Sequence, residues 1–262
     1  MLKIEANRPD FVSIRLMKQS YTAQEFGAIL KNTESRKGWD FSRMRTSSPP
    51  PPWEYPEVVK RYLKLSNKVL DIGTGGGERF TELAPYFKSG IGIDVDPAMI
   101  KTANENSANL ANLSFVLSDE NIKELPRDFN VVLNRHAPFN LKAVKNHLVE
   151  GGYFITQQVG EQNMLNIKRA LDLPILQPPI DSIMISANGL KTVDVREYDI
   201  EYIVKDIESL VFWLNALDML HADIEGTIAL KDVGVLNRVL KGNVTDRGFV
   251  TNEHRYLAIA QR

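Results

Sequence analysis

The chain has 262 residues, of which 43% are hydrophobic and 25% charged, and its formal net charge is −1. This composition is typical of a globular protein that buries a sizeable core. The sequence contains no cysteine, which excludes disulfides, thiolate zinc sites and cysteine nucleophiles. It also has no apolar run near the ~20 residues of a membrane span, and its N-terminus lacks the apolar stretch of a signal peptide. We therefore expect a cytoplasmic protein that does not contact membranes.

The first part of the chain is basic and reads as an arm. Residues 1–68 hold 13 Lys and Arg against 7 Asp and Glu, a balance of +6, and the remainder of the chain carries −7. Such an arm either packs on an acidic body or meets an anionic substrate. Thr22 and Glu25 have the spacing of a capping box, which predicts a helix over residues 22–32. Four consecutive prolines at 49–52 favour an extended strap. We predict an N-terminal arm or lid over residues 1–56.

After the arm, short apolar runs alternate with amphipathic stretches. Expected strands are 68–73, 89–95, 113–118, 129–135, 151–159, 193–204 and 254–261, and expected helices are 56–65, 78–87, 97–110, 139–149, 208–220 and 233–242. This alternation predicts an α/β domain with a doubly wound sheet of about seven strands, mostly parallel with an antiparallel C-terminal strand. We predict one domain over residues 57–262, with a cofactor half at 67–160 and an acceptor-side half at 161–262.

The first of these strands is followed by a glycine-rich turn. Residues 69–78 read VLDIGTGGGE, which places Gly73, Gly75 and Gly77 between a strand and a helix. Glycine allows the backbone to turn sharply and to approach a ligand closely, and the next helix starts with free N–H groups. Dinucleotide-binding enzymes share such a turn, so it does not identify the ligand by itself.

Three carboxylates narrow the choice of ligand. Asp71 precedes the glycines, where it can bind the ammonium of a methionine moiety, a group that a dinucleotide lacks. Asp94 ends the second strand, 21 residues after Gly73, and can accept bonds from two ribose hydroxyls. Asp119 ends the third strand and can accept from an adenine amine. Together they favour S-adenosyl-L-methionine over NAD.

Five motifs in this order resemble the class I S-adenosylmethionine-dependent methyltransferases, close to their UbiE-like branch (methyltransferase type 11). They read VLDIGTGGGE, IGIDVDPAMI, FVLSDENIKELP, FNVVLNRHAPFN and LVEGGYFITQQVG and cover residues 68–160. The resemblance implies a Rossmann-like fold that binds S-adenosyl-L-methionine. It places Asp71, Gly73, Thr74, Gly75 and Gly77 at the methionine end, Asp94 at the ribose with Val95 against the adenine, and Asp119, Glu120 and Asn121 at the adenine edge. Asn134 to His136 would face the transferred methyl. One departure is Asn130, where the family often has Asp.

For the residues that would act on the acceptor, the sequence leaves two roles open in each case. His136 is the candidate general base, because its ordinary pKa suits the task, and the alternative is a histidine that packs beneath the cofactor. Arg135 either clamps an acceptor carboxylate or phosphate or forms a structural pair. The aromatic residues of the arm either form a lid over the acceptor or anchor the arm to the core. These are Trp39, Phe41, Trp53 and Tyr55. We expect no metal site.

The leading functional prediction is methyl transfer to a small-molecule acceptor. The main alternative is an rRNA or tRNA methyltransferase that uses the basic arm to contact phosphates. A third is a non-catalytic, cofactor-binding regulatory protein, and a fourth, an NAD-dependent dehydrogenase, is disfavoured by Asp71. The sequence lacks the motif of adenine amino methyltransferases and the cysteine of 5-methylpyrimidine enzymes. It leaves the acceptor, its reacting atom and the oligomeric state open.

Overall fold

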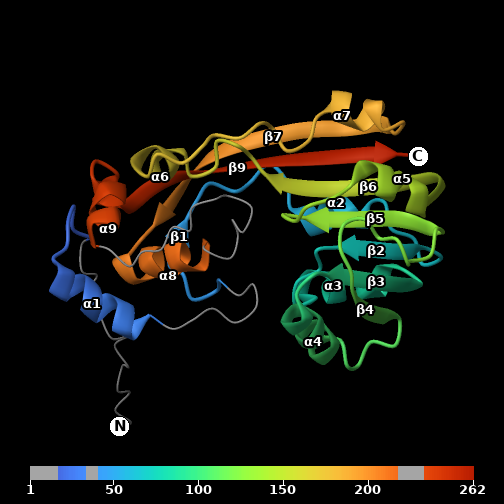
Figure 1. Cartoon of the computed structure of the whole chain (residues 1–262), viewed down its shortest axis with the longest axis horizontal. Helices are drawn as coiled ribbons and strands as arrows, with labels where there is room; N and C mark the ends of the chain where they lie inside the picture. The colour runs from blue at the N-terminus through green and yellow to red at the C-terminus, as the bar shows by residue number, and fades with distance from the viewer. Residues whose placement is uncertain (1–16, 34–40, 218–232) are drawn as a thin grey trace, which may run out of the picture. The chain divides into compact units, whose positions relative to one another are not determined.

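The computed structural model describes residues 17–33, 41–217 and 233–262 (Figure 1). Its contacts divide the chain into two compact units. The smaller unit takes residues 1–34, 44–47 and 203–250, and the larger takes 35–43, 48–202 and 251–262. The predicted boundary between an arm at residues 1–56 and a domain at 57–262 stays a prediction.

The elements agree closely with the expected ones. The helices are α1 (Ala23–Asn32), α2 (Tyr55–Lys60), α3 (Glu78–Leu83), the 3-10 turn η1 (Ala84–Tyr86), α4 (Pro97–Asn106), α5 (Leu141–His147), α6 (Leu165–Ala170), α7 (Ser182–Ala187), α8 (Ile207–Leu217) and α9 (Val233–Leu240). The strands are β1 (Thr46–Ser47), β2 (Lys68–Ile72), β3 (Ser89–Asp94), β4 (Leu113–Leu117), β5 (Phe129–Arg135), β6 (Leu148–Val159), β7 (Lys191–Val204), β8 (Val244–Thr245) and β9 (Gly248–Gln261). The sequence analysis did not predict α6, α7 or the two-residue strands β1 and β8.

The sheet of the larger unit runs in the order β7-β9-β6-β5-β2-β3-β4 (Figure 1). Strands β4, β3, β2, β5 and β6 are parallel, and β9 is antiparallel to β6. The predicted Rossmann-like sheet with an antiparallel C-terminal strand is therefore confirmed. Strands β7 and β9 continue into the smaller unit, where β1 pairs with the end of β7 and β8 with the start of β9. These additions bring the sheet to nine strands.

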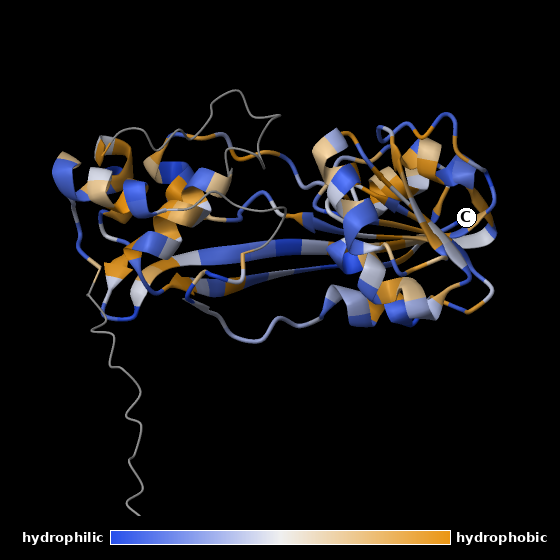
Figure 2. Ribbon diagram, turned by 90° about the horizontal axis from the view of Figure 1, so that it is seen from below, coloured by the Kyte–Doolittle hydropathy of each residue, from blue (hydrophilic) through white to orange (hydrophobic). Residues whose placement is uncertain are grey.

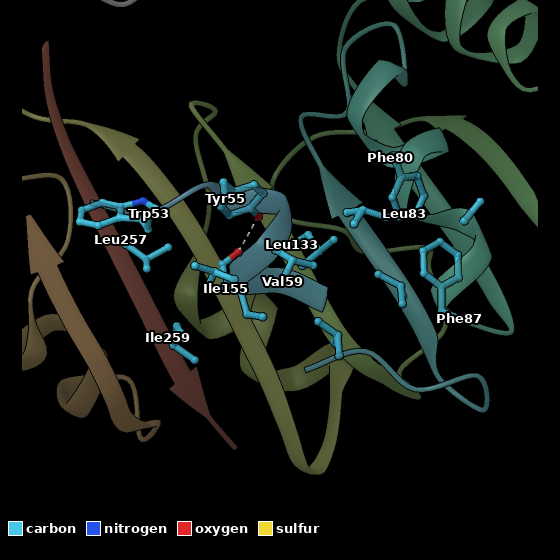
Figure 3. Close-up of a cluster of buried hydrophobic side chains, with 14 of the residues drawn as sticks. Trp53, Tyr55, Val59, Phe80, Leu83, Phe87, Leu133, Ile155, Leu257 and Ile259 are labelled. Atoms are coloured by element: carbon cyan, nitrogen blue, oxygen red, sulfur yellow. Dashed lines mark hydrogen bonds between the residues drawn. The ribbon is translucent and has the colours of Figure 1, made fainter. Parts of the chain in front are cut away.

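Alternate residues of the strands bury both faces of the sheet in the larger unit. Val69 and Leu133 point to the face covered by α2 and α3, where they pack with Phe80 (Figure 3). Leu70 and Val132 point to the opposite face, which is covered by α5 and α7. Both β2 side chains are fully buried, as expected for a parallel sheet between helical layers. Figure 2 shows the corresponding hydrophobic colouring of these inner strands.

Local sequence signals explain where the helices begin. The capping box at Thr22 and Glu25 is confirmed, with both reciprocal bonds present. The side chains of Asp96 and Asn140 cap α4 and α5 by accepting bonds from backbone N–H groups. The predicted helix over 78–87 is divided into α3 and η1, and Pro85 lies in the 3-10 turn. Among the described residues, no helix is long and apolar enough to cross a membrane.

Side-chain amides organise the smaller unit. Asn237 of α9 accepts a bond from the Tyr21 backbone N–H (2.8 Å) and donates to the Tyr21 carbonyl (2.9 Å). Gln19 similarly donates to the carbonyl of Val244 and accepts from the N–H of Gly242. The segment that leads into α1 is thus hydrogen-bonded along its length to α9 and the turn that follows it.

Candidate functional site

The glycine-rich turn after β2 is held against the end of β3. The backbone N–H groups of Gly73 and Thr74 both donate to the carbonyl of Ile93 at 2.9 Å. Gly73 has a φ of 72°, and a Cβ at this position would lie only 2.2 Å from the Cβ of Ala137. Both the left-handed backbone and the lack of space therefore require glycine here. The turn predicted from the sequence has the tight backbone geometry that close approach to a ligand needs.

Two polar side chains at this turn are suited to a ligand. Asp71 stands near the carboxyl end of β2 and is partly exposed. Burial raises the pKa of its carboxyl group to about 7, and repulsion from Asp94 acts in the same direction. Thr74 is buried, and the interaction of its hydroxyl with the Asp71 carboxyl group partly offsets this rise in pKa. A bound ammonium group would stabilise the ionised form of Asp71.

Asp94 ends β3, as predicted, and also organises the turn. Its Oδ2 accepts a bond from the N–H of Gly75 at 2.9 Å, and its Oδ1 accepts from the N–H of Asp96 at 3.0 Å. Each carboxylate oxygen retains a lone pair, so the bonds to ribose hydroxyls remain available. The next side chain, Val95, is 68% exposed. A large apolar group so exposed beside Asp94 is suited to pack against an aromatic ring.

The third predicted position lies after β4. Asp119 accepts from both the backbone N–H and the side-chain amide of Asn121, at 3.0 and 3.2 Å. These bonds lower the pKa of the Asp119 carboxyl group, so it is ionised near neutral pH. Asn121 Oδ1 in turn accepts from Asn140, the capping residue of α5, and Glu120 beside it is partly exposed. The loop is therefore ordered by its own side chains.

Asn134 has a different placement from the one expected. Its side chain is fully buried, and its amide donates to the carbonyl of Ile72 at 3.1 Å. Its Oδ1 accepts from Thr156 and from Gln158. These bonds connect β2, β5 and β6 inside the sheet. The side chain that was expected to face the transferred methyl thus has its polar atoms occupied by structural bonds.

His136 follows β5 and forms part of a hydrogen-bonded chain. Its backbone is left-handed, with a φ of 57°. Trp53 donates its indole N–H to Gln157 Oε1 at 2.9 Å, and Gln157 Nε2 lies 3.3 Å from His136 Nε2. Because the indole can only donate, the Gln157 oxygen must face it, and the amide N–H must face the imidazole. His136 Nε2 is therefore an acceptor, and the neutral ring carries its proton on Nδ1.

The surroundings of His136 keep the ring neutral. Burial lowers the pKa of His136 well below its ordinary value, and the charges of Arg135 and Arg255 lower it further. A ring in this state is a weak base, and its Nε2 lone pair is already engaged. This geometry is closer to the hydrogen-bonded alternative than to a general base. A catalytic role of His136 stays a prediction.

The aromatic residues of the strap pack inside the larger unit. Trp53 is 8% exposed and makes an edge contact with Tyr198, with ring centroids 4.7 Å apart. Tyr55 is 6% exposed, and its hydroxyl donates to the carbonyl of Asn134 and to that of Ile155, which Figure 3 shows. Phe41 is partly buried, and Trp39 lies outside the described residues. Trp53 and Tyr55 therefore anchor the strap to the core, which was one of the two expectations for them.

Arg135, the last residue of β5, is exposed. Two further arginines of the larger unit lie in its electrostatic environment, Arg79 of α3 and Arg255 of β9. The sequence analysis missed Arg255, because it is 120 positions away along the chain and belongs to no motif. The register of β9 against β6 brings it to this edge, where Arg255 pairs with Val159.

A hollow of about 330 Å³ lies elsewhere on the larger unit. It is lined by the first residues of β2, β3, β4 and β5, among them Lys68 and Ser89. The glycine turn and the three carboxylates lie at the carboxyl ends of the same strands. Ligands of open parallel sheets bind at that carboxyl edge, so we assign no functional role to this hollow.

Comparison with known proteins identifies a methyltransferase domain in this chain. Residues 63–174 match the model of a methyltransferase domain. An uncharacterized methyltransferase of Schizosaccharomyces pombe is 31% identical over 117 residues, which are 38% of this chain and 44% of the relative. The chain thus matches less than half of the length of this curated relative.

Solved structures share the fold at low sequence identity. The YcgJ protein of Bacillus subtilis superposes with a TM-score of 0.59 at 15% identity, covering 79% of this chain and 97% of that one. A functionally unknown protein of Deinococcus radiodurans R1 gives 0.58 at 16% identity, with 91% and 97% covered. A candidate methyltransferase of Bacillus halodurans C-125 gives 0.56 at 16% identity, with 79% and 98% covered.

The fold is that of the Rossmann-like domain typical of class I methyltransferases. Residues 63–174 match a methyltransferase domain, in agreement with the resemblance of the five motifs to class I S-adenosylmethionine-dependent methyltransferases. The resemblance recognised from the five motifs is thereby confirmed at the level of the family. Its assignment to the UbiE-like branch stays a prediction.

Proposed function

We propose that the protein transfers a methyl group from S-adenosyl-L-methionine to a small-molecule acceptor. The observation that carries this proposal is the position of three carboxylates at the carboxyl ends of three adjacent parallel strands. Asp71 lies near the end of β2, Asp94 ends β3, and Asp119 follows β4. These three strands are neighbours in the sheet. A cofactor with an ammonium group, a ribose and an adenine needs three such acceptors in a row.

The residues of the turn fit this cofactor. Asp71 would hold the ammonium group, the Thr74 hydroxyl would lie beside it, and the glycines would admit the methionine moiety. The cofactor supplies the reactive methyl sulfonium, and the chain orients the two reactants and excludes water. Val95 offers an apolar surface for the adenine, and Asp119 an acceptor for its amine.

The acceptor side is proposed at the carboxyl ends of β5 and β6. Arg135 ends β5 and His136 follows it, and Gln157 lies beside Arg135 on β6. Trp53 hydrogen-bonds to Gln157 and so holds the strap at this edge. A lid function of the arm and the cytoplasmic location inferred from the sequence also stay proposals.

A binding titration tests the cofactor. Purified protein is titrated with S-adenosyl-L-methionine, S-adenosylhomocysteine and NAD, using wild type, Asp94→Asn and the control Asp128→Asn. Asp128 is an exposed carboxylate at the opposite edge, where it pairs with Lys68. We expect Asp94→Asn to weaken S-adenosyl-L-methionine at least ~10-fold, because a charge-assisted bond is worth ~1.5–3 kcal/mol, and the control to change nothing. Binding of NAD without S-adenosyl-L-methionine would overturn the proposal.

The choice of acceptor class is tested separately. The net charge of −1 favours a small molecule over RNA. An RNA methyltransferase would bind tRNA or rRNA fragments with an affinity that falls steeply as salt increases. Methyl-labelled cofactor incubated with cell extract should label a low-molecular-mass fraction. Labelled RNA would establish the alternative, and cofactor binding without any labelled product would favour a non-catalytic regulatory protein.

A further inference from the structure

Arg135 stands apart from the other charged residues of the candidate site. Its side chain is exposed, and none of the described residues forms a hydrogen bond or an ion pair with its guanidinium. Other arginines of the larger unit do have partners. Arg79 pairs with Glu82 at 3.2 Å, and Arg255 contacts Asn163 and Glu253.

The strand register places Arg135 and Arg255 on one face of the sheet. Arg135 is the neighbour of Gln157 on β6, and Gln157 is the neighbour of Leu257 on β9. Arg255 lies two residues from Leu257 on the same strand, so its side chain points to the same face. Trp53 contacts Gln157 on this face as well. Asp71, the neighbour of Leu133 on β5, also shares this face and edge.

The guanidinium of Arg135 lies near charges of both signs. Desolvation lowers its pKa, and repulsion from Arg79 and Arg255 lowers it further, whereas Tyr55 and Glu253 raise it. Its charge also lowers the pKa of the Asp71 carboxyl group. Like charges held near one another are unfavourable unless an anion lies between or beside them. The neutral His136 next to Arg135 adds an N–H donor, since its Nε2 accepts from Gln157.

We propose that Arg135, flanked by the Nδ1–H donor of His136, binds an oxyanion group of the methyl acceptor, either a carboxylate or a phosphate. This inference rests on the proposed function, because it takes the acceptor to lie beside the cofactor at the ends of β5 and β6. A guanidinium is suited to such a group because its two parallel N–H bonds match the geometry of two oxygens. The acceptor is then an anionic small molecule, and Arg135 determines its orientation.

Probe anions test the subsite in solution. The ¹⁵N-labelled full chain is saturated with S-adenosylhomocysteine and titrated with benzoate, phenyl phosphate and the neutral benzyl alcohol. The indole N–H signal of Trp53, assigned with Trp53→Phe, reports binding. We expect saturable binding of benzoate or phenyl phosphate at least ~10-fold tighter than of benzyl alcohol, as a charge-assisted bond implies. The tighter of the two anions identifies the carboxylate or the phosphate.

Three variants locate the effect. Arg135→Gln should weaken anion binding at least ~10-fold, and Arg135→Lys, which keeps the charge without the paired donors, should lose less. Arg127→Gln removes an exposed arginine just before β5, at the opposite edge, and should leave anion binding unchanged. The affinity for S-adenosylhomocysteine should be the same in all variants, which also verifies that they fold.

The outcomes separate the two proposals. If wild type fails to bind S-adenosylhomocysteine, the proposed function is wrong. If it binds, the subsite is overturned by anions that bind no better than benzyl alcohol, or by equal losses in Arg135→Gln and Arg127→Gln. A parallel loss of S-adenosylhomocysteine in Arg135→Gln and Arg135→Lys would also overturn it, because Arg135 would then serve the cofactor carboxylate.

Discussion

Asp71 makes the binding of the cofactor depend on pH in a range where its ordinary carboxyl group would not titrate. Burial raises its pKa to about 7, against a usual value of 3.8. The ammonium group of the methionine moiety attracts only the ionised carboxylate. In the free protein this carboxylate is therefore half protonated near neutral pH, and binding must first release the proton.

The size of the effect follows from this competition. If only the ionised form binds, the apparent dissociation constant rises by a factor of one plus the ratio of protonated to ionised Asp71. For a pKa of about 7 this factor is about 11 at pH 6 and about 1.3 at pH 7.5, so affinity should increase about eightfold between them. The α-amino group of the cofactor itself titrates at about 8, so the range ends below that value.

Calorimetric titrations at pH 6.0, 6.5, 7.0 and 7.5 in constant salt measure this change. Asp71→Asn is the matched control, since it keeps the shape of the side chain and removes its titration. We expect the variant to bind weakly and with little pH dependence, so that dividing the two profiles isolates Asp71. Parallel profiles for wild type and Asp71→Asn would refute the reasoning.

The raised pKa of Asp71 also makes the stability of the folded protein depend on pH. A raised carboxyl pKa means that the folded protein binds the proton more tightly than the unfolded chain, so stability is highest at low pH and is lost as pH rises from about 4 through 7. The difference of about 3 pKa units corresponds to about 4 kcal/mol at most. Asp71→Asn should accordingly be more stable than wild type at pH 8 and should lose this advantage at pH 5, as urea unfolding at both pH values would show.

Three further substitutions test the geometry around the turn and the strap. Gly73→Ala should lower the free energy of unfolding by ~2–4 kcal/mol and abolish cofactor binding, because it adds both backbone strain and a steric clash. The control Gly151→Ala has the same left-handed backbone but open space at its Cβ, so it should cost only ~1–2 kcal/mol. Equal costs in urea unfolding would contradict the role of the clash. Tyr55→Phe should cost ~1 kcal/mol through the lost hydroxyl bonds, and an unchanged unfolding midpoint would show that they contribute nothing. Gln157→Leu should allow the ring proton of His136 to occupy either nitrogen, which ¹⁵N chemical shifts report; a ring that remains the Nδ1–H form would contradict the assigned hydrogen-bonded chain.

Local patterns in the sequence were sufficient to predict the positions of most strands and the glycine turn. The apolar run of β2 is short, and Val69 and Leu70 are both fully buried, which is the pattern of a parallel strand covered on two sides. The spacing between Gly73 and Asp94 is likewise local, because it spans one strand, one helix and the next strand. Such features depend on nearest neighbours along the chain, so the sequence displays them directly.

The side-chain arrangement of the acceptor side depends on long-range register and was not predictable in the same way. The family resemblance implied a place for Asn134 at the ligand, but its partners Thr156 and Gln158 come from the neighbouring strand and hold it inside the sheet. The left-handed backbone of His136 is unusual for a residue with a side chain, and no motif indicates it. The grouping of residues 203–250 with the N-terminal segment also depends on contacts between distant parts of the sequence, which no local pattern displays.

The strap that contains Trp53 combines features that the sequence predicted with contacts that it did not. Its prolines indicated an extended segment, and its aromatic residues indicated either a lid or an anchor. The structure shows that the anchor is specific, because the Trp53 indole fixes the orientation of Gln157, and Gln157 fixes the proton of His136 on Nδ1. A strap that only covered the site would need no such bond. We therefore infer that this part of the arm acts by positioning the residues after β5, and that the acceptor meets an arginine and a neutral histidine whose donors are already oriented.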